Sequence, residues 1–221
     1  MKIGLSAKIL IVIVLAILIL FFVLGGTAAL GFYAITNPGA FSVPTSTSTA
    51  PSGNYGTTGG DLANADALTE EQIIKLLKNF GDKGKNLLPY AKQIHDSGHA
   101  FNINPLFALA IANKDSSLGT AGAGRTCRNP GNLEYRDHKF AESGTPSIGN
   151  CSTYGGSSRW AAFKTYGDGM NAKMWLLRKN YLDKGLLTLH DIINKYCPPS
   201  ECDVDQYVKD VESFMNKYGN P

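Results

Sequence analysis

The chain has 221 residues and a formal net charge of +3 at pH 7. Every acidic residue and every cysteine lies from Asp61 onward, and residues 1–60 carry only Lys2 and Lys8 as charged side chains. The rest, roughly 150 residues, is long enough for one domain with a sizeable core. Most of the positive excess comes from the two N-terminal lysines, so this domain is close to neutral. A nucleic-acid partner is therefore not expected, because it would require a clustered basic face.

Residues 9–23 are continuously apolar, and with residues 24–35 they form a charge-free stretch. Such a stretch can cross a hydrocarbon layer of about 30 Å. Lys2 and Lys8 precede it, so the positive-inside bias keeps the N-terminus cytoplasmic and places the rest outside. The sequence thus predicts a cytoplasmic stub and one transmembrane helix in residues 1–35, anchoring the chain in the cell membrane. A cleaved signal peptide, which would give a secreted protein, is the alternative.

Residues 36–66 are rich in Ser, Thr, Gly and Pro, with PTSTSTAPSGNYGTTGG at their centre. This composition cannot bury enough apolar surface to fold, so we expect a flexible linker. The exported domain then occupies residues 67–221.

The four cysteines favour disulfides, because an even number in an exported domain is typical of them. Proximity pairs Cys127 with Cys151 and Cys197 with Cys202, although three connectivities are possible. The spacings fit no common zinc template. A catalytic Cys127 acting with His138 is a further alternative that the even cysteine set disfavours.

Helical signals dominate the first part of the domain. Thr69 and Gln72 fit a capping box ahead of an apolar helical face. A second helix is predicted from Leu87 to Ser97, stopped by Gly98. Asn104 and a proline after it predict the start of a third helix, residues 106–114, which is apolar almost all round. A helix with so little polar surface should be central in the domain.

Residues 119–160 are poor in regular signals and predict a long irregular loop with at most a short hairpin. Helices are predicted again after residue 166. Asp168 should cap one through Arg178, Thr188 one through Tyr196, and Asp203 or Asp205 the last, through Tyr218. The predicted fold is therefore mainly α.

A single acidic residue, Asp115, ends the apolar helix, and the Asn-rich turn Asn129–Asn132 follows a Gly-rich connector. Partial burial beside an apolar helix would raise the pKa of this carboxyl and keep a proton available. Protonation of a leaving oxygen by such an acid is what cleavage of a glycosidic bond needs.

Three segments resemble the lysozyme-like superfamily, in particular the glucosaminidase and lytic-transglycosylase-like domains of bacterial and phage cell-wall hydrolases. ALAIANKDSSLGT (residues 108–120) is similar to the helix end A-x-x-x-E-S-S-x-G of that family, and NPGN (129–132) to the turn that follows it. FKTYGDG (163–169) and YCPPSECDVDQYV (196–208) are similar to its closing helices, in which a Y-x-P-P-S-E turn precedes the final helix. The resemblance spans about Leu87 to Tyr218.

This resemblance implies a lysozyme-like helical domain that acts on peptidoglycan without a metal or an organic cofactor. The reaction would be cleavage of a β-1,4 bond between amino sugars, as a glucosaminidase, a muramidase or a lytic transglycosylase. The acid of the family is a Glu, whereas Asp115 is one methylene shorter. A non-catalytic peptidoglycan-binding or envelope-scaffold module that lost the Glu is therefore the alternative function.

Other residues near these motifs are candidates for the site. Glu134, directly after the NPGN turn, is the candidate second carboxylate, unless it is a solvated surface charge. The polar and aromatic residues predicted to hold the glycan are Ser116, Asn129, Asn132, Tyr135 and Tyr166. The Asn residues could instead serve the turn, and the Tyr residues could belong to the core.

A metal site is not predicted. His95 and His99 are four residues apart and could share a helix face, but the segment HDSGH lacks the Glu of a zincin motif and contains a helix-weakening glycine.

Overall fold

The computed structural model describes residues 59–135, 140–152 and 159–219, which all lie in one compact unit of the chain, Pro51–Pro221. In chain order the helices and strands are α2 (Gly59–Leu62), the 3₁₀ helix η1 (Ala65–Ala67), α3 (Glu70–Asn79), η2 (Gly81–Lys83), η3 (Leu88–Tyr90), α4 (Ala91–Phe101), α5 (Pro105–Ser116), α6 (Gly122–Cys127), η4 (Ala141–Ser143), β1 (Gly149–Cys151), β2 (Trp160–Ala162), α7 (Tyr166–Asn180), η5 (Leu182–Lys184), α8 (Leu189–Tyr196) and α9 (Val204–Tyr218). The predicted mainly α-helical class is confirmed.

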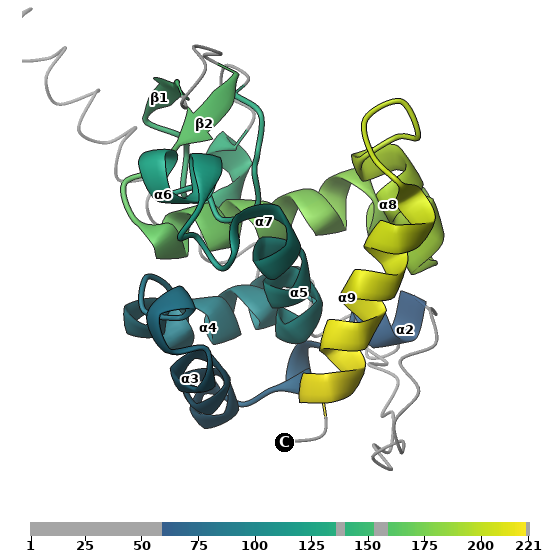
Figure 1. Cartoon of the computed structure of the whole chain (residues 1–221), viewed down its shortest axis with the longest axis horizontal. Coiled ribbons are helices and arrows are strands. Elements are labelled where there is room, and N and C mark those ends of the chain that lie inside the picture. The colour runs from purple at the N-terminus through teal and green to yellow at the C-terminus, as the bar shows by residue number, and fades with distance from the viewer. Residues whose placement is uncertain (1–58, 136–139, 153–158, 220–221) are drawn as a thin grey trace, which may run out of the picture. The chain divides into compact units, whose positions relative to one another are not determined.

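Helix α5 is the centre around which the other helices pack (Figure 1). It contacts α4, α6, α7 and α9, and every residue from Pro105 to Ala112 is buried. Asn104 caps its start by accepting a hydrogen bond of 2.8 Å from the Leu106 N–H. The predicted central position of this helix is confirmed, because a helix that is apolar on all sides must be covered on all sides.

The predicted N-caps are mostly the observed ones. Thr69 and Gln72 form the capping box of α3. Thr188 caps α8, and Asp203, rather than Asp205, caps α9.

The start of α7 differs from its prediction. Thr165 is the N-cap, and Asp168 occupies the third helical position, where its carboxylate accepts a hydrogen bond of 3.1 Å from the Thr165 N–H. The prediction that Asp168 caps this helix was wrong, because the residue completes a capping box from inside the helix.

The irregular segment contains a short antiparallel hairpin, as predicted. Strands β1 and β2 pair Gly149 with Ala162 and Cys151 with Trp160. The Cys127–Cys151 disulfide joins the end of α6 to β1, and a second disulfide joins Cys197 to Cys202. Both pairings expected from proximity are therefore formed. Helix α6 had no clear signal in the sequence.

The predicted membrane segment, residues 1–35, and most of the predicted linker lie outside the described residues. Within the described ranges, none of the helices is long and apolar enough to span a bilayer. Helical structure begins at Gly59, and Leu62 is only 2 % exposed, so the core includes residues before position 67.

Gly98 does not stop α4 as predicted. The helix continues to Phe101 and ends at Asn102 in the left-handed conformation, with φ of 48°. Gly98 lies where α4 meets the start of α5: a Cβ there would be 2.8 Å from Pro105 Cγ and 3.0 Å from the Ile103 carbonyl oxygen. The glycine therefore permits a close helix approach and does not terminate the helix.

We expect Gly98→Ala to destabilise the protein by about 1–3 kcal/mol, because the added methyl group meets a rigid proline ring and backbone. In an unobstructed helix the same change would stabilise by up to about 1 kcal/mol. Ala100→Gly, at an exposed position of the same helix, is the matched control and should cost about 0.5–1 kcal/mol. Thermal denaturation measures both, and a higher melting temperature for Gly98→Ala would contradict the packing described.

Candidate active site

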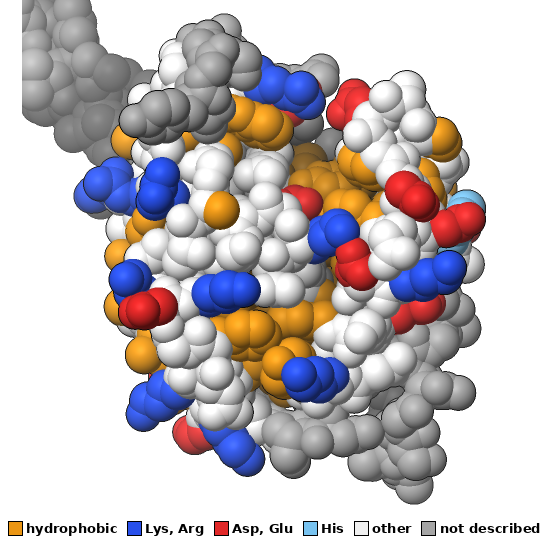
Figure 2. All heavy atoms as spheres, in the orientation of Figure 1, with side chains coloured by type: hydrophobic (Ala, Val, Ile, Leu, Met, Phe, Trp, Pro, Cys, Tyr) orange, Lys and Arg blue, Asp and Glu red, His pale blue; other side chains and the backbone are white. Residues whose placement is uncertain are grey.

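Asp115, the last acidic residue of α5, lines a cavity of about 390 Å³. The walls come from the turn after α5, from the start of β2, from α7, α8 and α9, and from the connector between α8 and α9. They include Asn132, Glu134, Arg159, Trp160, Tyr196 and Tyr207. Figure 2 shows a recessed, orange-coloured surface between the lobe of β1 and β2 and that of α8, with acidic and basic side chains interspersed over this face. A cavity of this size is within the range of small-ligand sites.

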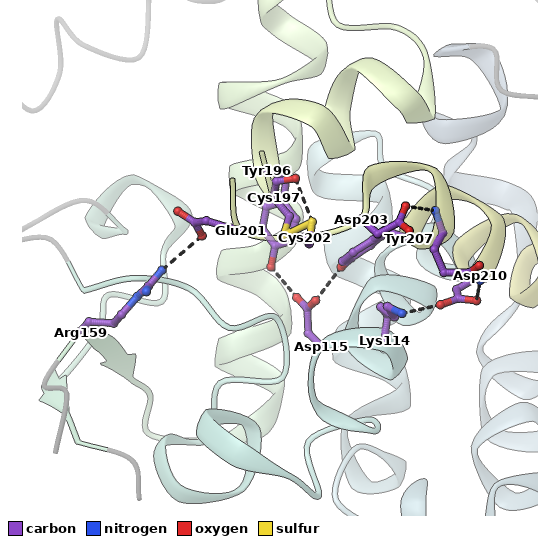
Figure 3. Close-up of a disulfide and its surroundings, with 11 residues drawn as sticks. Lys114, Asp115, Arg159, Tyr196, Cys197, Glu201, Cys202, Asp203, Tyr207 and Asp210 are labelled. Carbon is purple, nitrogen blue, oxygen red and sulfur yellow. Dashed lines mark hydrogen bonds and ion pairs between the residues drawn. A yellow bond between two sulfur atoms is a disulfide. The ribbon is translucent and has the colours of Figure 1, made fainter. Parts of the chain in front are cut away.

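Two tyrosine hydroxyls hold the Asp115 carboxyl, one at each oxygen (Figure 3). Tyr196, the last residue of α8, donates to Oδ2 in a short hydrogen bond. Tyr207, in the first turn of α9, donates to Oδ1 at 2.6 Å. Helix α5 therefore meets two consecutive helices that lie 81 and 92 residues further along the chain at these contacts, and the orientation of the carboxyl is fixed at both oxygens.

The Tyr196 hydroxyl has a second neighbour, the Gly131 carbonyl oxygen, at 2.7 Å. One hydroxyl has one proton and can donate fully to one of the two oxygens. The Gly131 carbonyl has no proton to donate, so Tyr196 must donate to it. The contact between Tyr196 and Asp115 is then also a hydrogen bond if Asp115 is protonated and donates to the Tyr196 oxygen. The geometry thus accommodates a protonated acid.

The electrostatic environment favours the same protonation state. Burial raises the pKa of Asp115 above its ordinary value, because the surrounding protein disfavours the charged form. The charge of Lys173 and the two phenol hydrogen bonds lower this pKa in part, and Lys114 contributes least. Burial, followed by the nearby Asp115 charge, raises the pKa of Tyr196 and of Tyr207 well above the usual range, so both remain neutral donors.

Two of the predicted sugar-binding residues, Asn129 and Ser116, make buried hydrogen bonds within the fold. Asn129 is fully buried; its amide nitrogen donates to the carbonyls of Leu133 and Ala161, and its oxygen accepts from the Leu133 N–H. The Ser116 hydroxyl, also buried, donates towards Ala112 and Pro130 carbonyls and accepts from a backbone N–H. Both side chains fasten the turn after α5.

Asn132 remains a candidate for ligand contact. It lines the cavity and has a left-handed backbone with φ of 47°. Its amide nitrogen donates to the Asp115 backbone carbonyl at 2.9 Å, whereas its Oδ1 is buried and has no hydrogen-bond partner among the described residues. A buried acceptor without a partner costs free energy, and a ligand N–H or O–H could satisfy it.

Glu134 also lines the cavity, as part of a charged cluster. Arg159 Nη2 is 2.6 Å from Glu134 Oε1 and 3.8 Å from Glu201 Oε2, so one guanidinium pairs with two carboxylates at the cavity wall. Figure 3 shows the contact between Arg159 and Glu201. The guanidinium also lies 4.8 Å from the Trp160 ring centroid. The cluster places one aromatic and three charged side chains at the wall of the cavity.

Tyr135 and Tyr166 lie outside this cavity. Tyr135 lines a separate hollow with Phe140. Tyr166 packs against Gly119, and its hydroxyl donates to the Arg125 carbonyl at 3.3 Å. The glycan contact predicted for either ring would therefore lie outside the Asp115 cavity.

His95 and His99 lie side by side on α4, with their Nε2 atoms 3.2 Å apart. Across residues 59–135, 140–152 and 159–219, no group of three or more His, Cys, Asp and Glu side chains is arranged to hold a metal ion. His138, the possible partner of a catalytic Cys127, is outside those ranges, and Cys127 is in a disulfide.

Tyr196 and Lys173 are among the residues of the site that were not predicted from the sequence. Tyr196 heads the segment YCPPSEC, and that position alone gave no chemical reason to select it. In the segment Met170–Leu177 of α7, every residue except Asn171 and Lys173 is apolar. Lys173 is fully buried. A lone cation in a buried helix is a signal that could have been followed.

Comparison with known proteins supports the fold. Neither a sequence profile of a protein family nor a curated protein sequence matches the chain. Among solved structures, the chain is similar to autolysin E of S. aureus, crystallised as a catalytic glutamate-to-alanine mutant in complex with the disaccharide NAG-NAM. The match has a TM-score of 0.50 and 14% sequence identity, and it covers 77% of this chain and 73% of that chain. The predicted resemblance to cell-wall hydrolases of the lysozyme-like type is thus confirmed for the fold.

The raised pKa of Asp115 predicts a specific dependence of stability on pH. The folded state binds this proton more tightly than the unfolded chain, in which Asp titrates near about pH 3.9. The contribution of Asp115 is therefore fully present below about pH 4 and is lost as the pH rises towards the raised folded value. Asp115→Asn keeps the shape and removes the titration, so the melting temperature of this variant should rise relative to that of the wild type as the pH increases above about 4.

Each kcal/mol corresponds to about 2–4 °C in a domain of this size. The measurement is a pair of thermal melts at each pH. A difference between the two proteins that does not change with pH would show that Asp115 has no raised pKa.

Proposed function

We propose that the chain is a glycosidase that cleaves β-1,4 bonds between the amino sugars of peptidoglycan, with Asp115 as the general acid. The observation that carries this proposal is the Asp115 carboxyl itself, which lines a cavity, has a raised pKa and is oriented at both oxygens by neutral tyrosines. A general acid needs this combination of proton retention and fixed geometry.

The proposed substrate follows from the walls of the cavity. The unpartnered Asn132 Oδ1 is an acceptor for an amide N–H such as that of an N-acetyl group. Trp160 offers an aromatic surface on which a sugar ring can stack. The ligand of the structurally similar autolysin E, NAG-NAM, belongs to the same chemical class.

In the proposed reaction, Asp115 gives its proton to the glycosidic oxygen as the bond to the anomeric carbon breaks. Water or a hydroxyl of the substrate itself then bonds to the anomeric carbon and releases its proton, giving a hydrolysed or a 1,6-anhydro product. Uptake of a proton by the Asp115 carboxylate restores the acid. Glu134 is the proposed electrostatic partner, and Arg159 at 2.6 Å holds it in place. No metal or organic cofactor takes part.

The proposed location is outside the cytoplasm, tethered to the cell membrane by residues 1–35 through the linker at 36–66. The two disulfides support this location, because they persist in oxidising compartments. A glycan layer next to the membrane would be within reach of such a tether.

Digestion of purified peptidoglycan by the oxidised full-length chain tests the reaction, with products identified by mass spectrometry. We expect released muropeptides from the wild type and a loss of at least about 10²-fold with Asp115→Asn. Asp115→Glu should also lose about 10²-fold, because both tyrosines are placed for the shorter side chain and a displacement of about 1 Å is costly.

The outcomes separate the two candidate functions. A gain of activity with Asp115→Glu would mean that the native site is a weakened form of a glutamate enzyme. Binding to intact glycan with no cleavage by any of the three proteins would reject the enzyme and support a non-catalytic peptidoglycan-binding module.

The two disulfides should differ in what their removal costs. Cys197–Cys202 closes the turn between Tyr196 and Tyr207, so its removal should lower activity by at least about 10-fold through the tyrosines. It closes a short loop, and the entropy lost in the unfolded chain is worth about 2 kcal/mol. Cys127–Cys151 closes a longer loop away from the acid, so its removal should cost about 3.5 kcal/mol of stability but little activity.

The test compares the two double Cys→Ser variants, measuring melting temperature and peptidoglycan turnover at a temperature at which both are folded. Equal losses of activity in the two variants would contradict a specific role for Cys197–Cys202.

A further inference from the structure

Lys173 of α7 is a fully buried lysine beneath the proposed acid. Its Nζ lies 3.3 Å from the Gly131 carbonyl oxygen and 3.6 Å from the centroid of the Tyr196 ring. Charged side chains are rarely buried completely, because desolvation of the ammonium costs several kcal/mol. A residue retained at such a cost invites a functional explanation.

The turn after α5 is shaped around this lysine. A Cβ at Gly131 would lie 2.7 Å from Lys173 Cδ and 2.9 Å from its Cγ, closer than real Cβ contacts. The glycine of the NPGN turn thus leaves room for the lysine stem, and the Gly131 carbonyl accepts from the lysine ammonium and from Tyr196. Lys173, Gly131, Tyr196 and Asp115 form one continuous network below the cavity.

We propose that Lys173 is a positioning residue for the acid: its ammonium holds the Gly131 carbonyl and the Tyr196 phenol in the arrangement that orients the Asp115 carboxyl. The inference rests on the proposed function of Asp115 and names the residue that helps to orient this acid. Lys173 itself acts through Tyr196 and Gly131 and through its charge.

The charge of Lys173 also lowers the pKa of Asp115. It is the largest of the influences that lower the pKa of Asp115 against burial. The other titratable groups that act on Asp115 are Tyr196 from α8, Tyr207 from α9 and Lys114 from α5. The remaining charged side chains of the cavity wall are Glu134, Arg159, Lys195 and Glu201. Without Lys173, the balance shifts towards the protonated carboxyl.

A structural role and a positioning role predict opposite results for Lys173→Met. Methionine has a similar length and no charge, and the Gly131 carbonyl keeps its hydrogen bond from Tyr196. Exchange of a buried charge for a well-packed apolar side chain is often neutral or stabilising. The positioning role therefore predicts a variant at least as stable as the wild type but impaired at the acid, whereas a structural role predicts a less stable variant.

The first test titrates the Asp115 carboxyl by NMR in the oxidised full-length chain labelled with [γ-¹³C]aspartate, with Asp115→Asn to assign the resonance. In Lys173→Met the midpoint should move to higher pH, since loss of a nearby cation disfavours the carboxylate. Lys114→Met is the matched control: Lys114 is exposed, pairs with Asp210 and should move the midpoint less. An unchanged midpoint in folded Lys173→Met overturns the proposal.

The second test measures turnover of peptidoglycan. Lys173→Met should lower kcat by about 10-fold or more with little change in KM, and should move the alkaline side of the pH profile to higher pH. Loss of activity with no movement of the profile, together with a lower melting temperature, would indicate a structural role. If the wild type cleaves nothing, the proposed function fails, and the NMR titration still decides the role of Lys173.

A second variant covers the case in which Lys173→Met does not fold. Gly131→Ala places a methyl group against the lysine stem and should displace the ammonium from the Gly131 carbonyl. It should move the Asp115 midpoint in the same direction, and an unchanged midpoint in this folded variant would equally reject the proposal.

Discussion

The site depends on one interaction, the contact of the Asp115 carboxyl with the hydroxyls of Tyr196 and Tyr207. The carboxyl comes from α5, at the centre of the fold, and the hydroxyls come from α8 and α9 on either side of a disulfide-closed turn. Because the two tyrosines are neutral, they orient the carboxyl without the strong lowering of its pKa that a direct contact with a cation would bring. Burial therefore raises the pKa of Asp115.

This arrangement explains why the most apolar helix carries the acid. A helix covered on all sides has a fixed position, so the residue at its end has one too. The turn that follows is fastened by buried Ser116 and Asn129, whose polar atoms are occupied by backbone groups. Rigid support of this kind is what proton delivery within hydrogen-bond distance requires.

Local signals in the sequence predicted local structure well. The caps at Thr69, Asn104 and Thr188 act through neighbouring backbone groups, so they are readable from residues close in the chain. The close packing at Gly98 and the buried hydrogen bonds of Asn129 were not predicted, because they depend on groups brought close only by folding: the Pro105 ring in one case and the Ala161 carbonyl in the other. Lys173 and Tyr196 escaped selection for the same reason, since their partners lie 42 and 81 residues away in the sequence.

The close approach of Gly131 and Lys173 couples the turn after α5 to helix α7. The two segments are far apart in the chain, so local structure alone would not link substitutions at these positions. A side chain at position 131 and a long stem at position 173 would occupy the same space. Among natural relatives of this chain, a larger residue in the turn should accompany a shorter one on α7, and a long cation on α7 should accompany glycine in the turn. A relative that changes only one of the two positions should therefore have an altered acid.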